Sequence, residues 1–479
     1  MFDEPYRPQF HFTPPQGKIN DPNGLCYFNG EWHLFYQLID PSLGLGSGLV
    51  WGHAVSRDLL HWQHLTPAIV PDRHGVIWSG SAVVDHHDTS GLFGGKGGMV
   101  CLFTYFDPAD GYQCQGLAHS ADGRTFTTLD RPVIGKWKDI PSQKDDKDFR
   151  DPKIFWHAPT ARWIMAVAGG RLRIYSSKNL RDWQFESMVE EINTECPDLM
   201  QMPIDGDAGN TTWLLSGGGR WYQLGDFDGK RFTPSTPRIP TDYGPDYYAT
   251  QTWDNAPGRY RQAISWLFNW QYETGNPHPF PTSPWERGLL TAPVRWSLRT
   301  TIDGVRLFQT PDPRLKLLRQ NLYVSRNCIL APGDPNPLVT GIGKTFDFSV
   351  TFSTSNRLVL SLPAERPQYV IEYDAERKEL ALDRTKSGIT TPENFSKRYT
   401  MPLPPREDGT VMLRVLIDHC SIEILAGRGE KTMTAIVFPD PQRGGMTLEA
   451  IDGPCQIHSL RLHAMKSAVL APIPVGEAR

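Results

Sequence analysis

A chain of 479 residues is too long for one small core, so we expect at least two domains. Its 49 basic and 53 acidic residues give a net charge of −4, which argues against a protein that binds nucleic acid through a basic surface. The 43 Gly and 41 Pro exceed their ordinary share and indicate many short elements joined by turns, as in β proteins. The 15 Trp, 16 Tyr and 22 Phe supply enough apolar surface to exclude a disordered chain.

The sequence also bears on the cellular compartment. No apolar run reaches the length of a membrane span, and the first residues, MFDEPYRPQF, lack the apolar core of a signal peptide. The seven cysteines are odd in number and form no C-x-x-C pair, which suits a reducing compartment. We therefore expect a cytoplasmic protein without membrane or nucleic-acid partners. The alternative is secretion after removal of a signal peptide, and the oligomeric state stays open.

The first 300 residues have the pattern of successive β-hairpins. LCYF (25–28), the dipeptide Asn29-Gly30 and EWHLFYQ (31–37) predict two strands joined by a two-residue turn. Long amphipathic helices are absent from the pattern. Further strands are predicted at 77–84, 99–106, 153–156, 163–170, 212–219 and 262–268.

A short motif recurs in this region. S-x-x-L-x-x-W at 56–62 returns at 177–183, with a variant at 120–126 and a fainter copy at 228–232. A recurrence of about 50 residues made of strands is typical of a β-propeller, whose blades each contain four strands. About 300 residues at this spacing predict five blades.

The pattern changes towards the C-terminus. Apolar and polar residues alternate in many short runs from about residue 345, which predicts the half-buried strands of a β-sandwich. We predict an all-β protein with a propeller at 1–310, a linker at 311–343 and a sandwich at 344–479. The predicted sandwich strands are 346–352, 357–362, 369–374, 379–384, 411–425, 433–438 and 456–463.

Several common kinds of site find no support. The sequence contains no H-E-x-x-H and no G-x-S-x-G, and the adjacent His86-His87 cannot present two metal ligands from one helix face. The glycines at 94–98 and 44–48 fit neither a phosphate-binding loop nor a dinucleotide fingerprint. We therefore predict no metal and no cofactor.

Three carboxylates stand next to predicted inner strands of different repeats. Asp21 precedes LCYF, Asp151 precedes KIFW, and Glu195 precedes Leu199. In a propeller the innermost strand of each blade lines a central channel, so equivalent positions on several blades converge. We predict that these three side chains meet in one funnel, although Asp-Pro and Asn-Gly pairs elsewhere are usually plain turns.

These residues lie in segments that resemble glycoside hydrolase family 32, the family of invertases, inulinases and levanases. The resemblance implies a five-bladed propeller followed by a β-sandwich, in agreement with the repeat and the alternation. It covers nearly the whole chain, in order. The segments are HFTPPQGKINDPNG (11–24), FYQ (35–37), WGHAVSRDLLHW (51–62), WSGS (78–81), FRDP (149–152), ECPDL (195–199), DYGPDYYA (242–249), NWQY (269–272) and LIDHCSIEIL (416–425).

The resemblance also implies roles for individual residues. Asp21 matches the nucleophile, Glu195 the general acid/base, and Asp151 the carboxylate that stabilises the transition state. Substrate-binding roles are implied for Asn20, Asn23, Gln37, Trp51, Trp78, Ser79, Arg150, Cys196, Tyr248 and Trp270. Such chemistry requires a protonated Glu195 beside an ionised Asp21, and we expect Arg150 to keep its neighbour Asp151 ionised.

The implied activity is that of a retaining β-fructofuranosidase, acting on sucrose or on fructans. The alternatives are a fructosyltransferase with the same residues, a non-catalytic sugar-binding propeller, and another five-bladed glycosidase family that acts on arabinans. Lys18 stands where the family commonly has Trp, and the loop 38–48 is small and glycine-rich. Because this rim is poor in aromatic residues, we expect water to be the main acceptor of the fructosyl group. If the protein is a transferase, we expect Trp51 or Trp221 to hold the acceptor sugar.

Overall fold

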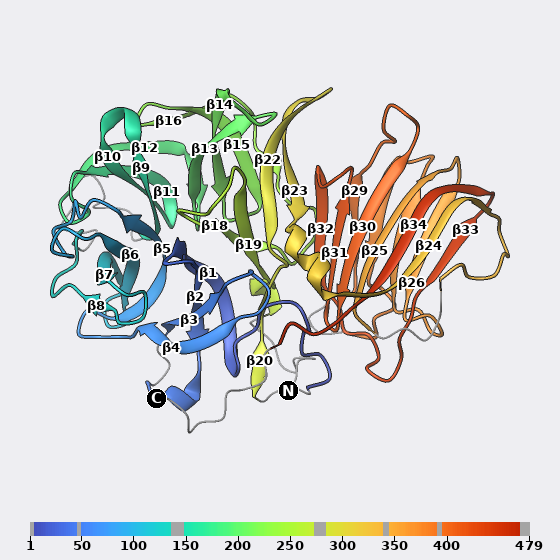
Figure 1. The fold of residues 1–479 in the computed structure, drawn as a ribbon, viewed down its shortest axis with the longest axis horizontal. Coiled ribbons are helices and arrows are strands. Elements are labelled where there is room, and N and C mark those ends of the chain that lie inside the picture. The colour runs from blue at the N-terminus through green and yellow to red at the C-terminus, as the bar shows by residue number, and fades with distance from the viewer. Residues whose placement is uncertain are drawn as a thin grey trace.

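The computed structural model describes residues 4–45, 49–135, 148–272, 284–338, 344–389 and 395–469. It is built almost wholly of β-strands, which form two bodies side by side (Figure 1). The strands up to β23 make a five-bladed β-propeller, coloured blue to yellow, and the later strands make a β-sandwich in orange and red. The predicted fold class is confirmed. Within the described ranges, no helix has the length and apolar character that crossing a membrane requires.

The five blades follow one another along the chain. The first is β1 (Gly17–Phe28), β2 (Glu31–Ile39), β3 (Val50–Ser56) and β4 (Gln63–Ile69). The second is β5 (Val76–Asp85), β6 (Gly98–Asp107), β7 (Tyr112–Ser120) and β8 (Thr127–Thr128). The third is β9 (Arg150–His157), β10 (Arg162–Ala168), β11 (Gly170–Ser177) and β12 (Trp183–Thr194). The fourth is β13 (Asp198–Ile204), β14 (Asp207–Gly217), β15 (Trp221–Phe227) and β16 (Phe232–Pro234), with β17 (Ile239–Pro240) added to β15.

The fifth blade contains an insertion that reaches back to the first. Its strands are β18 (Tyr248–Thr252), β19 (Arg261–Leu267), β22 (Val294–Thr301) and β23 (Gly304–Pro311), and the short β21 (Leu289–Leu290) pairs with β19. Between β19 and β22 the chain also forms β20 (Trp285–Arg287), which runs parallel to β1 and pairs Trp285 with Gly17. The last blade therefore joins the first and closes the ring.

The recurring motif marks the same turn in four blades. Ser56, Ser120 and Ser177 are the last residues of β3, β7 and β11, and each hydroxyl accepts a hydrogen bond from a backbone N–H two or three residues later. A residue with positive φ follows in each turn, and the fourth strand starts beyond it. These residues are Leu59 (φ 64°), Gly123 (φ 70°), Leu180 (φ 62°) and, in the fourth blade, Gly229 (φ 92°). The sequence repeat is thus the turn between the third and fourth strands of a blade.

The predicted hairpins are confirmed, but two inner strands begin earlier than expected. Asp21 lies inside β1 and Asp151 inside β9, because pairing extends back to Lys18, opposite Ile39, and to Arg150, opposite Ala168. Only Glu195 precedes its inner strand. The pairing is irregular beside both aspartates, so the strands continue past residues whose side chains leave the regular pleat.

The sandwich consists of two antiparallel sheets around one core. The larger sheet has the order β24–β34–β25–β30–β31–β32, and the smaller has β29–β28–β27–β26–β33. The predicted run 411–425 forms two strands that turn at His419 and Cys420. The bounds are β25 (Phe346–Ser353), β26 (Arg357–Leu362), β27 (Tyr369–Asp374), β28 (Glu379–Asp383), β29 (Arg398–Pro402), β30 (Val411–Asp418), β31 (Ser421–Ala426), β32 (Lys431–Ile436), β33 (Thr447–Ile451) and β34 (Cys455–Met465).

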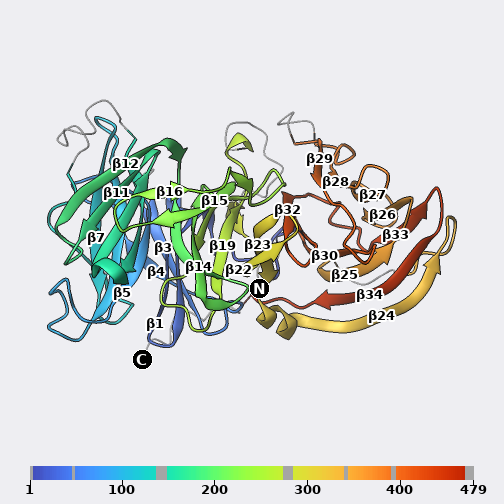
Figure 2. The ribbon, with the colours of Figure 1, turned by 90° about the horizontal axis from the view of Figure 1, so that it is seen from above.

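The predicted linker at 311–343 is wrong. Its middle forms β24 (Arg319–Leu330), which pairs with β34 along nearly its whole length, and the two run side by side at the outer edge of the sandwich (Figure 2). The connection between the domains is the short 3₁₀ helix Pro313–Leu318, which Asp312 caps by accepting a hydrogen bond from the Arg314 N–H. The prediction gave weight to prolines and charges and overlooked the strand pattern that follows them.

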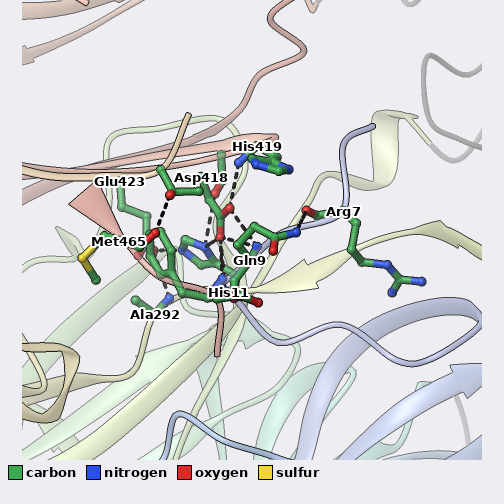
Figure 3. Close-up of polar contacts among 12 residues, drawn as sticks. Arg7, Gln9, His11, Ala292, Asp418, His419, Glu423 and Met465 are labelled. Atoms are coloured by element: carbon green, nitrogen blue, oxygen red, sulfur yellow. Dashed lines mark hydrogen bonds and ion pairs between the residues drawn. The ribbon is translucent and has the colours of Figure 1, made fainter. Parts of the chain in front are cut away.

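A buried charge cluster joins the N-terminal segment to the sandwich (Figure 3). The imidazole of His11 lies between the carboxylates of Asp418 and Glu423, with Nδ1 2.8 Å from Asp418 Oδ2 and Nε2 2.5 Å from Glu423 Oε1. Asp418 also accepts hydrogen bonds from the backbone N–H groups of residues 9–11, and Glu423 accepts one from Ala292 N–H. Two strands of the sandwich thereby fix a segment that leads directly into β1.

Candidate active site

The three predicted carboxylates meet in one pocket of the propeller. The pocket encloses about 470 Å³, and Asp21, Asp151 and Glu195 all line it, each from a different blade. The thiol of Cys196 bridges two of them, since its Sγ lies 3.4 Å from Asp21 Oδ2 and 3.6 Å from Asp151 Oδ2. Carboxylates 130 residues apart in sequence are thus neighbours in space.

Hydrogen bonds fix the orientation of both aspartates. Ser79 Oγ donates to Asp21 Oδ2 at 2.6 Å, and the backbone N–H of Asp21 donates to Asn20 Oδ1 at 2.7 Å. Asp151 Oδ2 accepts a hydrogen bond from the backbone N–H of Cys196 at 3.0 Å. Each carboxylate therefore takes one defined position before any ligand enters.

The backbone at the site adopts conformations that side chains disfavour. Asp151 (φ 63°), Cys196 (φ 42°) and Ala249 (φ 51°) all have positive φ although none is glycine. Each left-handed backbone conformation costs about 1–2 kcal/mol. Such conformations persist where surrounding contacts hold them, and they cluster at functional sites. Asp151 is held through its own N–H, which donates to Thr104 Oγ1 at 3.1 Å.

Glu195 lies between two donors. Arg150 Nη2 donates to its Oε1 at 2.6 Å, and the Tyr248 hydroxyl donates to its Oε2 at 2.6 Å. Arg150 is itself fixed by Asp148, whose Oδ1 lies 2.7 Å from Nη1. The Glu195 side chain is 36% exposed, so of the three carboxylates it is the one that faces the entrance.

Burial shapes the electrostatics of the aspartates. Desolvation, reinforced by the nearby Asp151 charge, raises the pKa of Asp21 to about 7. Desolvation also raises the pKa of Asp151 to about 6, against the opposing effect of the Arg150 charge. Both aspartates consequently keep their protons to higher pH than a solvent-exposed carboxyl does.

Two electrostatic expectations require correction. We expected Asp21 to stay ionised, but burial raises its pKa to about 7, so at neutral pH it is not fully ionised. We also expected Arg150 to keep Asp151 ionised. The Arg150 charge does lower the pKa of Asp151, but desolvation outweighs it, and the guanidinium forms its ion pairs with Glu195 and Asp148. Successive residues of a strand point to opposite faces, so Arg150 and its sequence neighbour diverge.

The walls of the pocket contain most of the predicted binding residues. Asn20, Gln37, Trp78, Ser79, Arg150, Cys196, Tyr248 and Trp270 all line it. Both amide atoms of Gln37 are buried and have no hydrogen-bond partner among the described residues, so they are available to a ligand. Trp78 stacks on Phe106 with ring centres 4.1 Å apart, and Trp270 is 46% exposed at the rim.

Two predicted binding residues lie behind the pocket. Trp51 is fully buried, and its indole N–H donates to the backbone oxygen of Trp78 at 3.0 Å. Asn23 is also buried, and its Oδ1 accepts a hydrogen bond from the Gly80 N–H, which ties β1 to β5. Both support the wall and neither is among the residues that line it, and the fully buried Trp51 offers no face to an acceptor.

Sequence reasoning missed several lining residues. Leu49, Phe106, Gly111, Gln113 and Asp148 complete the pocket. Phe106 and Gln113 face each other across the β6–β7 hairpin, and the available signal was that Phe106 ends the predicted strand 99–106. The predicted loop 38–48 is described only in part, because residues 46–48 lie outside the described ranges.

A second hollow adjoins the pocket on the side of Glu195. It encloses about 530 Å³ and shares Asp148, Arg150, Glu195 and Tyr248 with the pocket. Its far wall includes Trp221, whose ring is covered on one side by the Arg238 guanidinium at 4.2 Å. We call this hollow the outer groove. A ligand longer than one sugar ring can occupy pocket and outer groove together, with Glu195 at their junction.

Comparisons with known proteins agree with this architecture. Residues 11–311 match the model of the glycosyl hydrolases family 32 N-terminal domain, and residues 315–464 match that of the family 32 C-terminal domain. A levanase of Bacillus subtilis is 36% identical over 97% of this chain and 71% of its own length. An extracellular exo-inulinase of Aspergillus niger is 34% identical over 91% of this chain and 90% of its own length.

Solved structures show the same similarity. The exo-inulinase of Aspergillus awamori has a TM-score of 0.87 and 31% identity, covering 98% of this chain and 100% of its own. A fructofuranosidase of Schwanniomyces occidentalis, solved in complex with fructosylnystose, has a TM-score of 0.83 and 27% identity, covering 97% of this chain and 98% of its own. With its fold, its three converging carboxylates and these relatives, the chain belongs to glycosyl hydrolases family 32 and is a glycoside hydrolase.

Proposed function

We propose that the protein is a retaining β-fructofuranosidase that removes terminal, non-reducing fructose from sucrose and from fructans. One observation carries the proposal, namely that three carboxylates from three blades converge in one sugar-sized pocket. In the proposed roles Asp21 is the nucleophile, Glu195 the general acid/base, and Asp151 holds sugar hydroxyls and stabilises the transition state. Glycosidases of this kind use two carboxylates around an oxocarbenium-like transition state.

The positions of the residues suit a double displacement. Asp21 attacks C2 of the fructosyl unit while Glu195 gives its proton to the glycosidic oxygen, so the C2–O bond breaks and the leaving sugar departs. Water then enters, Glu195 takes a proton from it, and the resulting hydroxide displaces Asp21 from C2. Positive charge at C2 in both steps is stabilised by Asp151.

The outer groove suits an enzyme that acts on chain ends. A terminal fructose in the pocket places its glycosidic oxygen near Glu195, and the rest of the substrate then extends into the outer groove. That groove has room for more than the glucose of sucrose. The levanase and exo-inulinase relatives support fructans as substrates in addition to sucrose.

Transfer to a sugar acceptor is the second candidate function. We expected few aromatic residues at the rim, but Trp221 lines the outer groove and presents a flat ring on which an acceptor sugar can stack. Hydrolysis remains the proposal, because the names of the relatives describe hydrolases. With low-millimolar sucrose a hydrolase releases glucose and fructose in nearly equal amounts, whereas a transferase releases an excess of glucose and accumulates trisaccharides.

Two variants test the catalytic assignment. Asp21→Asn removes the nucleophile and should abolish turnover of every fructoside, with the fold kept. Glu195→Gln should nearly abolish sucrose hydrolysis but spare more activity on 4-nitrophenyl β-fructofuranoside, whose leaving group needs no proton. Asp205→Asn, an exposed aspartate at a turn of the fourth blade, serves as the matched control with unchanged rates.

The stereochemistry tests retention directly. Proton NMR of the first product formed should show β-fructofuranose before mutarotation. An α-anomer as the first product would mean inversion and would overturn the double displacement. Near-normal turnover by Asp21→Asn would overturn the nucleophile assignment.

A further inference from the structure

The segment that leads into Tyr248 is held by the sandwich. Residues 241–247 run along strand β32, where Tyr243 N–H donates to Thr432 O at 2.8 Å and Asp246 N–H donates to Thr434 O at 3.3 Å. The two chains approach so closely that a Cβ at Gly244 would lie 2.0 Å from Thr434 O. The propeller segment therefore takes its position from a strand of the other domain.

An ion pair without solvent access strengthens this contact. Arg384, just after β28 of the sandwich, places Nη1 2.7 Å from Asp246 Oδ2, and neither side chain is exposed. The same carboxylate oxygen accepts the Ile436 N–H at 2.8 Å, and Nη1 of Arg384 also donates to Ile436 O at 2.8 Å. A buried pair with this many additional hydrogen bonds fixes position strongly.

The other end of Arg384 reaches a second wall of the pocket. Its Nη2 donates to the Tyr272 hydroxyl at 2.9 Å, and Tyr272 belongs to the 3₁₀ helix Trp270–Tyr272. Trp270 of that helix lines the pocket. Asn269 links the two walls, because its side-chain amide donates to Pro245 O at 2.9 Å.

We propose that Arg384 is a positioning residue for catalysis, which acts from the sandwich through Asp246 on Tyr248, and through Tyr272 on Trp270. The inference rests on the proposed function, since it assigns Tyr248 the task of orienting the acid/base Glu195. Tyr248 follows Asp246 by two residues and donates to Glu195 Oε2 at 2.6 Å. A shift of the 241–247 segment therefore moves the hydroxyl that orients Glu195.

The preference for one leaving group over another distinguishes a misplaced Glu195 from a general loss of rigidity in the protein. Glu195 faces Arg150 and Asp151 of β9, Asp21 of β1, and the Tyr248 hydroxyl of β18, and only the last is reached from Asp246. Loss of the Tyr248 donor should lower sucrose turnover more than turnover of 4-nitrophenyl β-fructofuranoside.

The test compares three substitutions in the full-length protein. Arg384→Lys keeps the positive charge but cannot contact Asp246 and Tyr272 at the same time. Asp246→Asn keeps the shape of the side chain and loses only its charge. Each should lower kcat/KM for sucrose about tenfold to hundredfold, as expected for small misplacements at an active site. Asp418→Asn is the matched control, a buried carboxylate at the same domain interface that holds residues 9–11, and it should lower the melting temperature without changing kcat/KM.

A double substitution identifies the route. On a Tyr248→Phe background, Asp246→Asn should cause no further loss of leaving-group discrimination, since the hydroxyl it positions is gone. The proposal would be overturned if Asp246→Asn reduced leaving-group discrimination as much on the Tyr248→Phe background as it does alone. It would also be overturned if Asp246→Asn and Asp418→Asn had equal effects on kcat/KM. If Arg384→Lys does not fold, Asp246→Asn decides.

Failure of the proposed function gives a different result. In that case Glu195→Gln and Tyr248→Phe alone leave the sucrose and nitrophenyl rates in their wild-type ratio, whatever Arg384 does. If those two variants behave as proposed while Arg384→Lys and Asp246→Asn retain wild-type kinetics on both substrates, only the positioning role of Arg384 is refuted.

Discussion

The charge cluster around His11 predicts a specific loss of stability at alkaline pH (Figure 3). Both ring nitrogens face carboxylate oxygens, and only the imidazolium has two N–H groups to donate. Burial alone would lower the pKa of His11, but the hydrogen bonds and charges of Asp418 and Glu423 outweigh it and raise the pKa to about 9. Because the folded value lies above the value of about 6.5 in unfolded chains, the stabilisation is complete below that pH and disappears as the pH rises through 9.

The magnitude follows from the two pKa values. Linkage between 6.5 and about 9 stabilises the fold by about 2–3 kcal/mol at pH 7 and by nearly nothing at pH 10. His11→Gln cannot carry the charge, so it removes this dependence. The free energy of unfolding should therefore differ between wild type and variant by about 2–3 kcal/mol more at pH 7 than at pH 10.

Urea unfolding followed by tryptophan fluorescence at pH 7, 8, 9 and 10 measures this difference. His419→Gln is the matched control, since burial lowers the pKa of His419 and that histidine is already neutral at pH 7. The control should track wild type across the pH range. A difference between wild type and His11→Gln that stays constant from pH 7 to pH 10 would show that His11 is neutral in the fold, and would refute the reasoning.

Three further outcomes are expected. The kcat/KM for sucrose should fall as the pH drops through about 7, because Asp21 attacks only when ionised, and Ser79→Ala should move this acid limb to higher pH by removing the donor to Asp21. Trp221→Ala should raise the KM for inulin and levan several-fold and leave the KM for sucrose nearly unchanged, as steady-state assays on the three substrates will show. Trp51→Ala should cost about 3–5 kcal/mol in urea unfolding, since the buried ring supports the wall that carries Trp78 and does not touch substrate.

The blades could be predicted because local turn chemistry repeats. Leu59 and Leu180 occupy equivalent left-handed positions of one turn, so the same short motif had to recur wherever a blade passes from its third to its fourth strand. The convergence of the carboxylates followed from the propeller geometry alone. These features depend on contacts between residues close in sequence, or on the symmetry of a repeat.

Other features of the site depend on side-chain direction, which the sequence does not contain. Trp51 and Trp78 are the same residue type in neighbouring segments, yet one is fully buried and the other lines the pocket. Arg150 was assigned to its sequence neighbour, whereas its partner Glu195 lies 45 residues away on the next blade. The contact between Arg384 and Asp246 spans 138 residues and two domains, and no local pattern marks either residue.

The way the N-terminal segment is anchored has a consequence for the order of folding during synthesis. Residues 9–11 find the partner of their N–H groups in Asp418, about 409 residues later, and β1 finds its parallel neighbour only when β20 has been made. A ribosome that adds about 5–20 residues per second delivers Asp418 some 20–80 seconds after the first strand. The first blade has an open edge only until β20 emerges, about 13–50 seconds after the first strand at the same rate, and the ring can close only after the fifth blade has emerged. The nascent propeller is therefore exposed to edge-to-edge association until its own late strands arrive, and its need for chaperones should depend on the speed of translation.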